Sequence, residues 1–343
     1  MKKLLNVLYV STENAKVLKE RETLSVVSDG EELGRFPIHM LQGLVTFGPV
    51  WVSPWAMQFC AERGVTISCF TDKGKFLARV DGPISGNVLL RKEQYRQSDS
   101  EERSLALARG LVAAKIANGR NTLQRHLRNH PQVDGVAAVR NAVSDLATLQ
   151  AQCRDVRQLD SLRGIEGTAA AVYFSCFDHL VLNQKEDFSF DARNRRPPLD
   201  PVNAMLSFVY SLLAHDCRSA LEGVGLDPQA GFLHRDRPGR PSLALDLAEE
   251  FRHALADRVV LNLINLQQVK RNGFSFQPSG AVEMDDETRK TVLVAWQKKK
   301  QEEILHEYIG ERIQAGLLFH VQALLLARTV RGDLPCYPAY VVR

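Results

Sequence analysis

Residues 98–116, with the sequence SDSEERSLALARGLVAAKI, mark the point at which the chain changes from strand-like to helical patterns. The segment Ser98-Asp99-Ser100-Glu101 has the spacing of a capping box at a helix start. Behind it, apolar residues recur at helical spacing on one stripe, namely Leu105, Ala108, Val112 and Ile116. We therefore expect a long helix to begin here and helices to dominate the rest of the chain.

The chain before this point predicts short strands. The apolar and β-branched stretches lie at residues 6–10, 23–27, 65–70 and 75–80. Ser28-Asp29-Gly30 predicts the turn of one hairpin, and Thr71-Asp72-Lys73-Gly74 predicts the turn of a second. Between the hairpins, Ser53 as N-cap, Pro54 at the first helical position and Gly64 past the end predict one short helix.

These patterns predict an α+β chain of two domains. The first is a small β-rich domain over residues 1–95, with a linker from about residue 82, and the second is a larger all-α domain over residues 96–343. Further helix starts are expected at Asp200-Pro201, ahead of residues 202–213, and at Ser242, ahead of residues 243–255. A last long helix is expected over residues 286–328.

Length and composition agree with a soluble globular protein. The chain has 343 residues, of which 45% are apolar, so it can bury a large core. We find no apolar run of membrane-spanning length and no secretion signal at the start, which favours a cytoplasmic protein without a membrane partner. The six cysteines show no Cys-x-x-Cys spacing, so we interpret them as reduced thiols.

The net charge of +4 is too small to prove a nucleic-acid partner, but the basic residues are bunched. The three bunches are Arg193, Arg195 and Arg196; Arg235, Arg237 and Arg240; and Lys298, Lys299 and Lys300. Any one of them is most simply a solvated face. All three bunches flank the residues that could carry chemistry, which weakens that interpretation.

Those residues are three carboxylates and one histidine. Glu166 lies among small residues, including Gly164 and Gly167, that would allow a second helix to approach closely. Asp246 and Glu249 are three apart, so they share one helix face and repel each other. Either a bound cation or Arg252 at the next turn could compensate for that repulsion.

His234 precedes the helix of Asp246 and Glu249 and can fold back over its first turns. With Glu166 it would complete a Glu/His/Glu set with Asp246 as an auxiliary carboxylate. Oxygen ligands with one imidazole suit Mg²⁺ or Mn²⁺ better than structural zinc. The alternative is an acidic, solvated helix face.

Two other groups of polar residues remain open to interpretation. Asn203, Ser207 and Tyr210 line one face of an otherwise apolar helix, either to support metal ligands or a phosphate, or simply to join core helices. His215-Asp216 is an HD dipeptide of the kind found in helical metal phosphohydrolases, although its surroundings match that class poorly.

Three segments together resemble a known family, the CRISPR-associated adaptation integrases, which are the universal spacer-acquisition endonucleases, in particular those of subtype I-C. The segments are residues 163–167 with Tyr173, residues 200–210, and residues 231–234 followed by 241–252. The resemblance covers the whole chain.

The resemblance implies an N-terminal domain that mediates homodimerisation and a C-terminal domain that holds Mg²⁺ or Mn²⁺ through Glu166, His234 and Glu249, with Asp246 close by. It implies that the 3′-hydroxyl of a short DNA fragment attacks a phosphodiester of the CRISPR repeat, a transesterification that serves spacer acquisition and antiviral defence. The phosphates of double-stranded DNA would be neutralised by Arg235, Arg237, Arg240 and Arg252. It also implies a small ferredoxin-like partner that bridges two dimers, and a RecB-like nuclease partner.

Two rival functions follow from the same residues. In the first, Glu166, His234 and Glu249 make structural ion pairs in a non-catalytic DNA-binding scaffold. In the second, His215 belongs to an HD-like phosphohydrolase.

Overall fold

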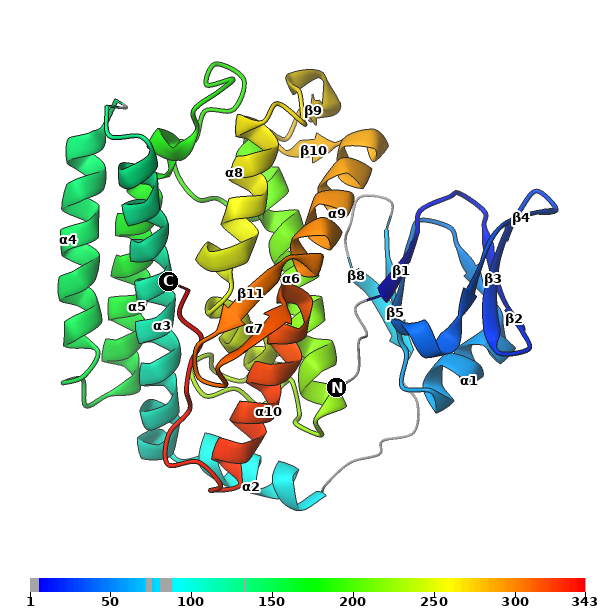
Figure 1. The fold of residues 1–343 in the computed structure, drawn as a ribbon, viewed down its shortest axis with the longest axis horizontal. Coiled ribbons are helices and arrows are strands. Elements are labelled where there is room, and N and C mark those ends of the chain that lie inside the picture. The colour runs from blue at the N-terminus through cyan, green and yellow to red at the C-terminus, as the bar shows by residue number, and fades with distance from the viewer. Residues whose placement is uncertain (1–5, 72–75, 81–87, 133, 343) are drawn as a thin grey trace. The chain divides into compact units, whose positions relative to one another are not determined.

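The computed structural model describes residues 6–71, 76–80, 88–132 and 134–342, and it divides the chain into two units, residues 1–86 and 87–343. The first unit is rich in strands and the second is mostly helical, which confirms the predicted α+β class (Figure 1). The division falls before residue 95, because α2 (Val88–Ser98) packs on α3 (Glu101–Asn129) in the second unit.

The first unit contains two four-stranded sheets. One has the order β1-β5-β7-β8, formed by Asn6–Val10, Leu41–Phe47, Thr66–Phe70 and Phe76–Val80. The other has the order β4-β3-β2-β6, formed by Glu31–Pro37, Thr23–Ser28, Lys16–Glu20 and Trp51–Val52. β1 pairs with β5 and β5 pairs with β7 in parallel, so these neighbours are joined by crossovers and not by hairpins.

The local signals in this unit are confirmed where the structure describes them. β3 and β4 form the expected hairpin, with Asp29 and Gly30 both at positive φ in its turn. β7 and β8 pair in antiparallel fashion, while residues 72–74 of their expected turn lie outside the described residues. In α1 (Pro54–Glu62), the Ser53 side chain accepts from the Ala56 N–H, and Gly64 follows at a φ of 69°. One apolar core unites α1 with strands of both sheets.

The second unit is built mostly of helices of different lengths. Those that concern the site are α4 (Val136–Gln152), α5 (Leu159–Ser175), α6 (Pro201–Gly223), α7 (Ser242–Glu249) and α8 (Asp257–Asn265). α3, α4 and α5 pack side by side (Figure 1), and the apolar stripe of α3 is buried as expected. Asp200 caps α6 by accepting from the Asn203 N–H. The cap of α3 is Ser100 and not Ser98, because Ser98 ends α2.

The helix expected over residues 243–255 is interrupted. After α7, one π-helical turn (Arg252–Ala256) precedes α8. The carbonyl of Glu250 accepts from the Asn118 side chain at 2.8 Å, and the Glu250 carboxylate accepts from the Tyr340 N–H at 2.6 Å. Because α3 and the C-terminal segment bind this residue, the backbone departs from regular α-helical hydrogen bonding here.

The prediction of one long helix over residues 286–328 is wrong. α9 (Asp286–Gln301) ends before a hairpin of β11 (Glu303–His306) and β12 (Glu311–Gln314), and α10 (Leu318–Val330) follows. A second small hairpin joins β9 (Phe274–Phe276) to β10 (Val282–Met284). The second unit is therefore mostly helical and not all-α.

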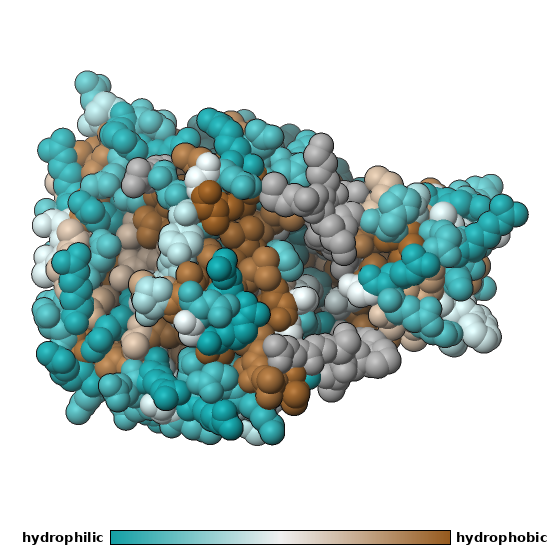
Figure 2. Space-filling view, turned by 60° about the horizontal axis from the view of Figure 1, so that its bottom comes forward, coloured by the Kyte–Doolittle hydropathy of each residue, from teal (hydrophilic) through white to brown (hydrophobic). Residues whose placement is uncertain are grey.

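One face of the helical unit carries both hydrophilic and apolar side chains. Figure 2 shows hydrophilic side chains around its rim and a band of apolar side chains nearer its middle. Within the described ranges, no helix has the length and apolar character needed to cross a membrane.

Candidate functional site

Glu166 and Glu249 meet at a lysine that the sequence reasoning missed. Lys115, in the middle of α3, forms ion pairs with Glu166 on α5 and with Glu249 at the end of α7, the latter at 2.7 Å between Nζ and Oε2. The side chains of Lys115 and Glu249 are 4% and 2% exposed, whereas that of Glu166 is 26% exposed. The two carboxylates thus face each other from different helices across a buried ammonium group.

Glu249 is ionised despite its burial. Burial raises the pKa of its carboxyl group, but the charges of Arg252 and Lys115 outweigh this effect and hold the pKa well below the usual range. Arg252 lies 3.0 Å from Oε1 of Glu249. Oε2 of Glu249 is buried without a hydrogen bond of good geometry, although Lys115 is within ion-pair distance. This oxygen is therefore occupied by the Lys115 ammonium group, and it becomes available to a cation only if that group moves away.

Asp246 orients His234, whereas Glu166 and Glu249 pair with Lys115. The fully buried carboxylate of Asp246 accepts from the backbone N–H groups of Phe232, Leu233 and His234 at 2.7, 2.9 and 3.0 Å. It also lies 2.6 Å from Nδ1 of His234. Because an ionised carboxylate only accepts, Nδ1 carries a proton, which leaves Nε2 as the ring nitrogen that could bind a metal.

The loop that carries His234 is held tightly against α7 and α5. A Cβ atom on Gly231 would lie 2.7 Å from the Cβ of Ser242, so only glycine fits there without a shift. Arg163 on α5 donates to the Leu233 carbonyl at 2.6 Å. A cavity of about 330 Å³ opens beside His234 and is also lined by Arg163.

The helix seam expected at Gly164 and Gly167 lies elsewhere. A Cβ atom at either glycine would meet nothing within 4 Å. The close approach is at Gly119 of α3, where a Cβ would lie 3.1 Å from His253 and 3.2 Å from Tyr173. Glu166 nevertheless lies at the junction of α5 and α3, through Lys115.

The polar residues of α6 contact two arginine side chains, Arg193 and Arg252. Asn203 and Ser207 accept from Arg193 at 2.6 and 3.1 Å, and the guanidinium of Arg193 lies 5.3 Å from the centre of the Tyr210 ring. The guanidinium of Arg252 lies 4.9 Å from the same ring centre. Tyr210 thus contacts the partner of Glu249, whereas Asn203 and Ser207 reach the site only through Arg193.

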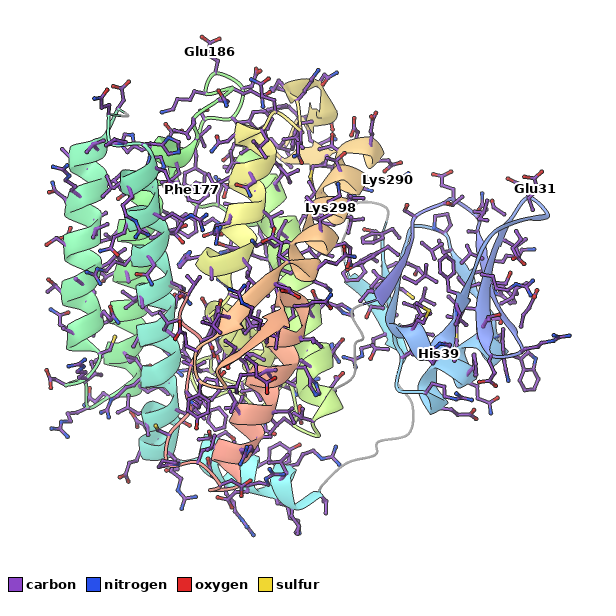
Figure 3. All side chains as sticks on the ribbon, in the orientation of Figure 1. Glu31, His39, Phe177, Glu186, Lys290 and Lys298 are labelled. Atoms are coloured by element: carbon purple, nitrogen blue, oxygen red, sulfur yellow. The ribbon has the colours of Figure 1, made fainter. Side chains whose placement is uncertain are left out.

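The basic bunches differ in what they can bind. Arg235 and Arg237 are exposed in the loop after His234, and Arg235 pairs with Asp160 at 2.5 Å. Arg240 is partly exposed. Of the three lysines, Lys298 is exposed (Figure 3), while Lys299 and Lys300 are buried and paired with Glu302 and Asp216.

The HD dipeptide has a structural explanation. Asp216 accepts from Trp296 Nε1 at 2.9 Å and from Lys300 Nζ at 2.9 Å, inside the packing of α6 against α9. Its carboxylate is therefore already engaged by two donors, which removes support for the HD-like phosphohydrolase.

The donor set suits a hard divalent cation, with one condition. Two carboxylates and an imidazole held through Nδ1 are the groups that Mg²⁺ and Mn²⁺ accept. Over the described ranges, however, no three His, Cys, Asp or Glu side chains lie close enough to hold one ion. Lys115 stands between Glu166 and Glu249, so binding requires its ammonium group to move aside.

The signal for Lys115 was present in the sequence. Ala108, Leu111, Lys115, Asn118 and Thr122 follow one another at spacings of three and four. A lysine on that stripe must be buried against other helices, and a buried lysine needs a carboxylate partner. Which carboxylates would supply it depended on the fold.

The family of the chain follows from comparison with known proteins. The family described as CRISPR associated protein Cas1 matches residues 8–298. A relative from Chlorobaculum tepidum, called CRISPR-associated endonuclease Cas1 1, is 49% identical over 343 residues, which is 100% of both chains. The chain therefore belongs to the Cas1 family of CRISPR-associated endonucleases.

Solved structures agree with this fold. A Cas1 protein from Thermotoga maritima superposes with a TM-score of 0.82 at 22% identity, covering 97% of this chain and 99% of that one. A casposase bound to integration product also reaches 0.82 at 22% identity, covering 98% and 94% of the two chains. At this identity the likeness concerns the fold alone.

Two further matches have names that include other proteins. A Rhodospirillum rubrum relative, called CRISPR-associated exonuclease Cas4/endonuclease Cas1 fusion, is 37% identical over 98% of this chain and 57% of its own length. A structure described as a Cas6-RT-Cas1–Cas2 complex has a TM-score of 0.81 at 22% identity, covering 99% of this chain and 36% of that one.

Proposed function

We propose that the chain is a metal-dependent DNA endonuclease and integrase that inserts short foreign DNA fragments into a CRISPR array. The observation that carries this proposal is the meeting of Glu166 and Glu249 at Lys115, with His234 oriented nearby by buried Asp246. The casposase neighbour, which is bound to integration product, supports an integrase reaction on this fold.

Glu166, His234 and Glu249 would hold Mg²⁺ or Mn²⁺ in this proposal, with Asp246 as a positioning residue. The bound ion would polarise the scissile phosphate and favour attack by a DNA 3′-hydroxyl in a transesterification, or by water in hydrolysis. Arg252 keeps Glu249 ionised, and the Tyr210 ring contacts Arg252 from the side of α6. No protein nucleophile is required.

Arg235, Arg237 and Arg240 would neutralise phosphates of double-stranded DNA, because they line the loop next to His234 and are wholly or partly exposed. Arg252 would act only through Glu249, since its side chain is 11% exposed. Asn203 and Ser207 would act through Arg193 and not on DNA directly.

Assembly and context form a further part of the proposal. Homodimerisation through the strand-rich unit is supported by the exposure of Trp51 and Trp55, which are 52% and 72% exposed. A small ferredoxin-like partner and a RecB-like nuclease partner are supported by the complex with Cas2 and by the Cas4 fusion of the two matches. The subtype I-C assignment rests on the sequence motifs alone. A cytoplasmic location would follow from the DNA substrate.

The rival function is a DNA-binding scaffold. It is favoured by one observation, which is that Lys115 and Arg252 already neutralise Glu166 and Glu249. In a scaffold these contacts would be permanent structural ion pairs, and no cation would need to replace Lys115.

Strand transfer of a labelled short duplex into supercoiled plasmid distinguishes the two functions. The assay compares the unaltered protein, His234→Ala and the control His215→Ala, each with Mn²⁺ or EDTA. The integrase predicts product that needs both Mn²⁺ and His234 but not His215. DNA binding without any metal-dependent product, also after addition of the Cas2-type partner, would favour the scaffold.

A further inference from the structure

A second basic site lies on α3, away from the carboxylates. A cavity of about 430 Å³ opens between the C-terminal half of α3, the segment around Leu180 and Leu182, and α8. Its α3 wall includes Arg125, ten residues after Lys115, which corresponds to about 15 Å along the helix axis. This cavity is therefore distinct from the Glu166–Glu249 site.

The described lining is basic and contains no Asp or Glu. Arg125 and Arg128 come from α3 and Arg258 comes from α8, and none of the three makes an ion pair within the described part of the chain. Burial lowers the pKa of the Arg258 guanidinium, and the charge of Arg125 lowers it further. The nearby carboxylate that opposes this shift, Glu302, is itself paired with Lys299. The cavity thus gathers positive charge that the described residues leave unneutralised.

His126 adds an unsatisfied polar atom to the same wall. It lines the cavity, is only 9% exposed, and its Nε2 atom is buried without a hydrogen-bond partner. The neighbouring ring of His130 also lines the cavity, with 5.2 Å between the ring centres. A buried imidazole nitrogen without a partner is a cost to the fold that a hydrogen-bonding group of a ligand would remove.

The walls of the cavity are fixed by hydrogen bonds. Asn265 accepts from the Leu182 N–H at 2.8 Å and donates to the Leu180 carbonyl at 2.9 Å. Asn121 donates to the Val342 carbonyl at 2.6 Å on the other side. A site with fixed walls loses little entropy when a ligand binds.

We propose that this cavity binds a phosphate-bearing nucleotide, with its phosphate at Arg125, Arg128 and Arg258. Guanidinium groups match phosphate oxygens in pairs of hydrogen bonds. The volume lies in the range of small-molecule sites, and Leu180, Leu182 and Leu261 supply an apolar wall for a base. The source favoured here is one nucleotide of a DNA strand, which rests on the proposed function; a free nucleotide has the same chemistry.

Binding of a labelled short single strand, measured by fluorescence anisotropy in EDTA, tests the proposal without catalysis. The variants are the pair Arg125→Gln and Arg128→Gln, which changes exposed side chains, and Arg258→Gln, which changes a partly buried one, so the thermal unfolding of each variant is measured to confirm that it is folded. The control is the pair Arg140→Gln and Arg154→Gln, which removes the same charge from exposed positions outside the cavity. At about 0.15 M salt we expect about fourfold weaker binding when this one phosphate contact is lost, since each phosphate contact on a single strand contributes a salt slope of about 0.7.

The outcomes separate this inference from the proposed function. A loss of affinity in the cavity variants but not in the control supports a strand as the ligand. A thermal shift with deoxyadenosine monophosphate that the cavity variants lose, with strand binding unchanged, supports a free nucleotide. If the cavity variants match the control in both measurements, the inference is overturned, even when the unaltered protein performs strand transfer. Absence of metal-dependent strand transfer, by contrast, concerns only the proposed function.

Discussion

Replacement of Lys115 by methionine should destabilise the metal-free protein and strengthen its response to Mn²⁺. Without the ammonium group, buried Glu249 keeps Arg252 as its cation, while Glu166 is partly open to water. Breaking a buried ion pair typically costs about 3–5 kcal/mol, and these remaining contacts place the loss near about 3 kcal/mol. For a unit of this size that corresponds to a melting temperature lower by about 6–12 °C.

The effect of Mn²⁺ should have the opposite sense. If Lys115 occupies the place that the cation needs, its removal tightens Mn²⁺ binding, and a tenfold tightening adds about 1.4 kcal/mol to the stabilisation by excess metal. Thermal unfolding with Mn²⁺ or EDTA measures both quantities, and titration calorimetry measures the Mn²⁺ affinity directly.

Lys300→Met is the matched control. Lys300 is equally buried and is paired with Asp216, but it lies outside the carboxylate site. It should lower the melting temperature in EDTA without any larger gain from Mn²⁺. Equal gains from Mn²⁺ in the unaltered protein and in Lys115→Met would refute the idea that the lysine and the metal compete for one place.

Three other changes test separate parts of the structure. Asp246→Asn should reduce metal-dependent strand transfer by about 10–100-fold through loss of the His234 orientation; equal loss of metal-free DNA binding would indicate a general folding defect. Gly231→Ala should lower the free energy of unfolding by about 1–3 kcal/mol, because its Cβ has no room, whereas Gly164→Ala, with open space around it, should cost nothing in denaturant titrations. For His126, burial and then the charge of neighbouring cationic groups lower the pKa from 6.5 to about 4. Its contribution to stability is therefore present above about pH 6.5 and is lost as the pH falls towards 4, by about 2 kcal/mol at about pH 5, and His126→Gln should flatten that part of the stability profile.

The elements that the sequence could predict are those with capping residues next to them in the chain. The helix between Ser53 and Gly64 and the start of α6 at Asp200 each depend on a few adjacent residues, and both are confirmed. The parallel pairing of β1 with β5 joins strands far apart in the chain, for which no local signal exists. The expected helix over residues 286–328 failed because its helical periodicity continued across a hairpin whose turn holds Gly310 at a φ of 67°.

In the candidate site too, the sequence predicted contacts within one helix but not contacts between distant segments. The sequence placed Asp246 and Glu249 on one helix and expected Arg252 as a possible counter-ion, and the structure has that ion pair. The sequence did not predict that the Asp246 carboxylate accepts hydrogen bonds from a loop. Only the fold brings the three backbone N–H groups of that loop to the carboxylate. Lys115 was missed because its partners lie on two other helices.

The hydrogen bonds from three successive backbone N–H groups to Asp246 show where this protein could be labelled. The backbone of His234 is held by its own N–H group, which donates to Asp246. The exposed residues 235–239 follow this hydrogen bond in the chain, so a substitution among them leaves it in place. Since Arg235 and Asp236 accept hydrogen bonds from Ser242 and Gly231, a fluorescent label is best placed at residues 238–239, where under the proposed function it would lie near bound DNA while the imidazole stays in place. This turn offers a position from which substrate arrival can be observed in real time.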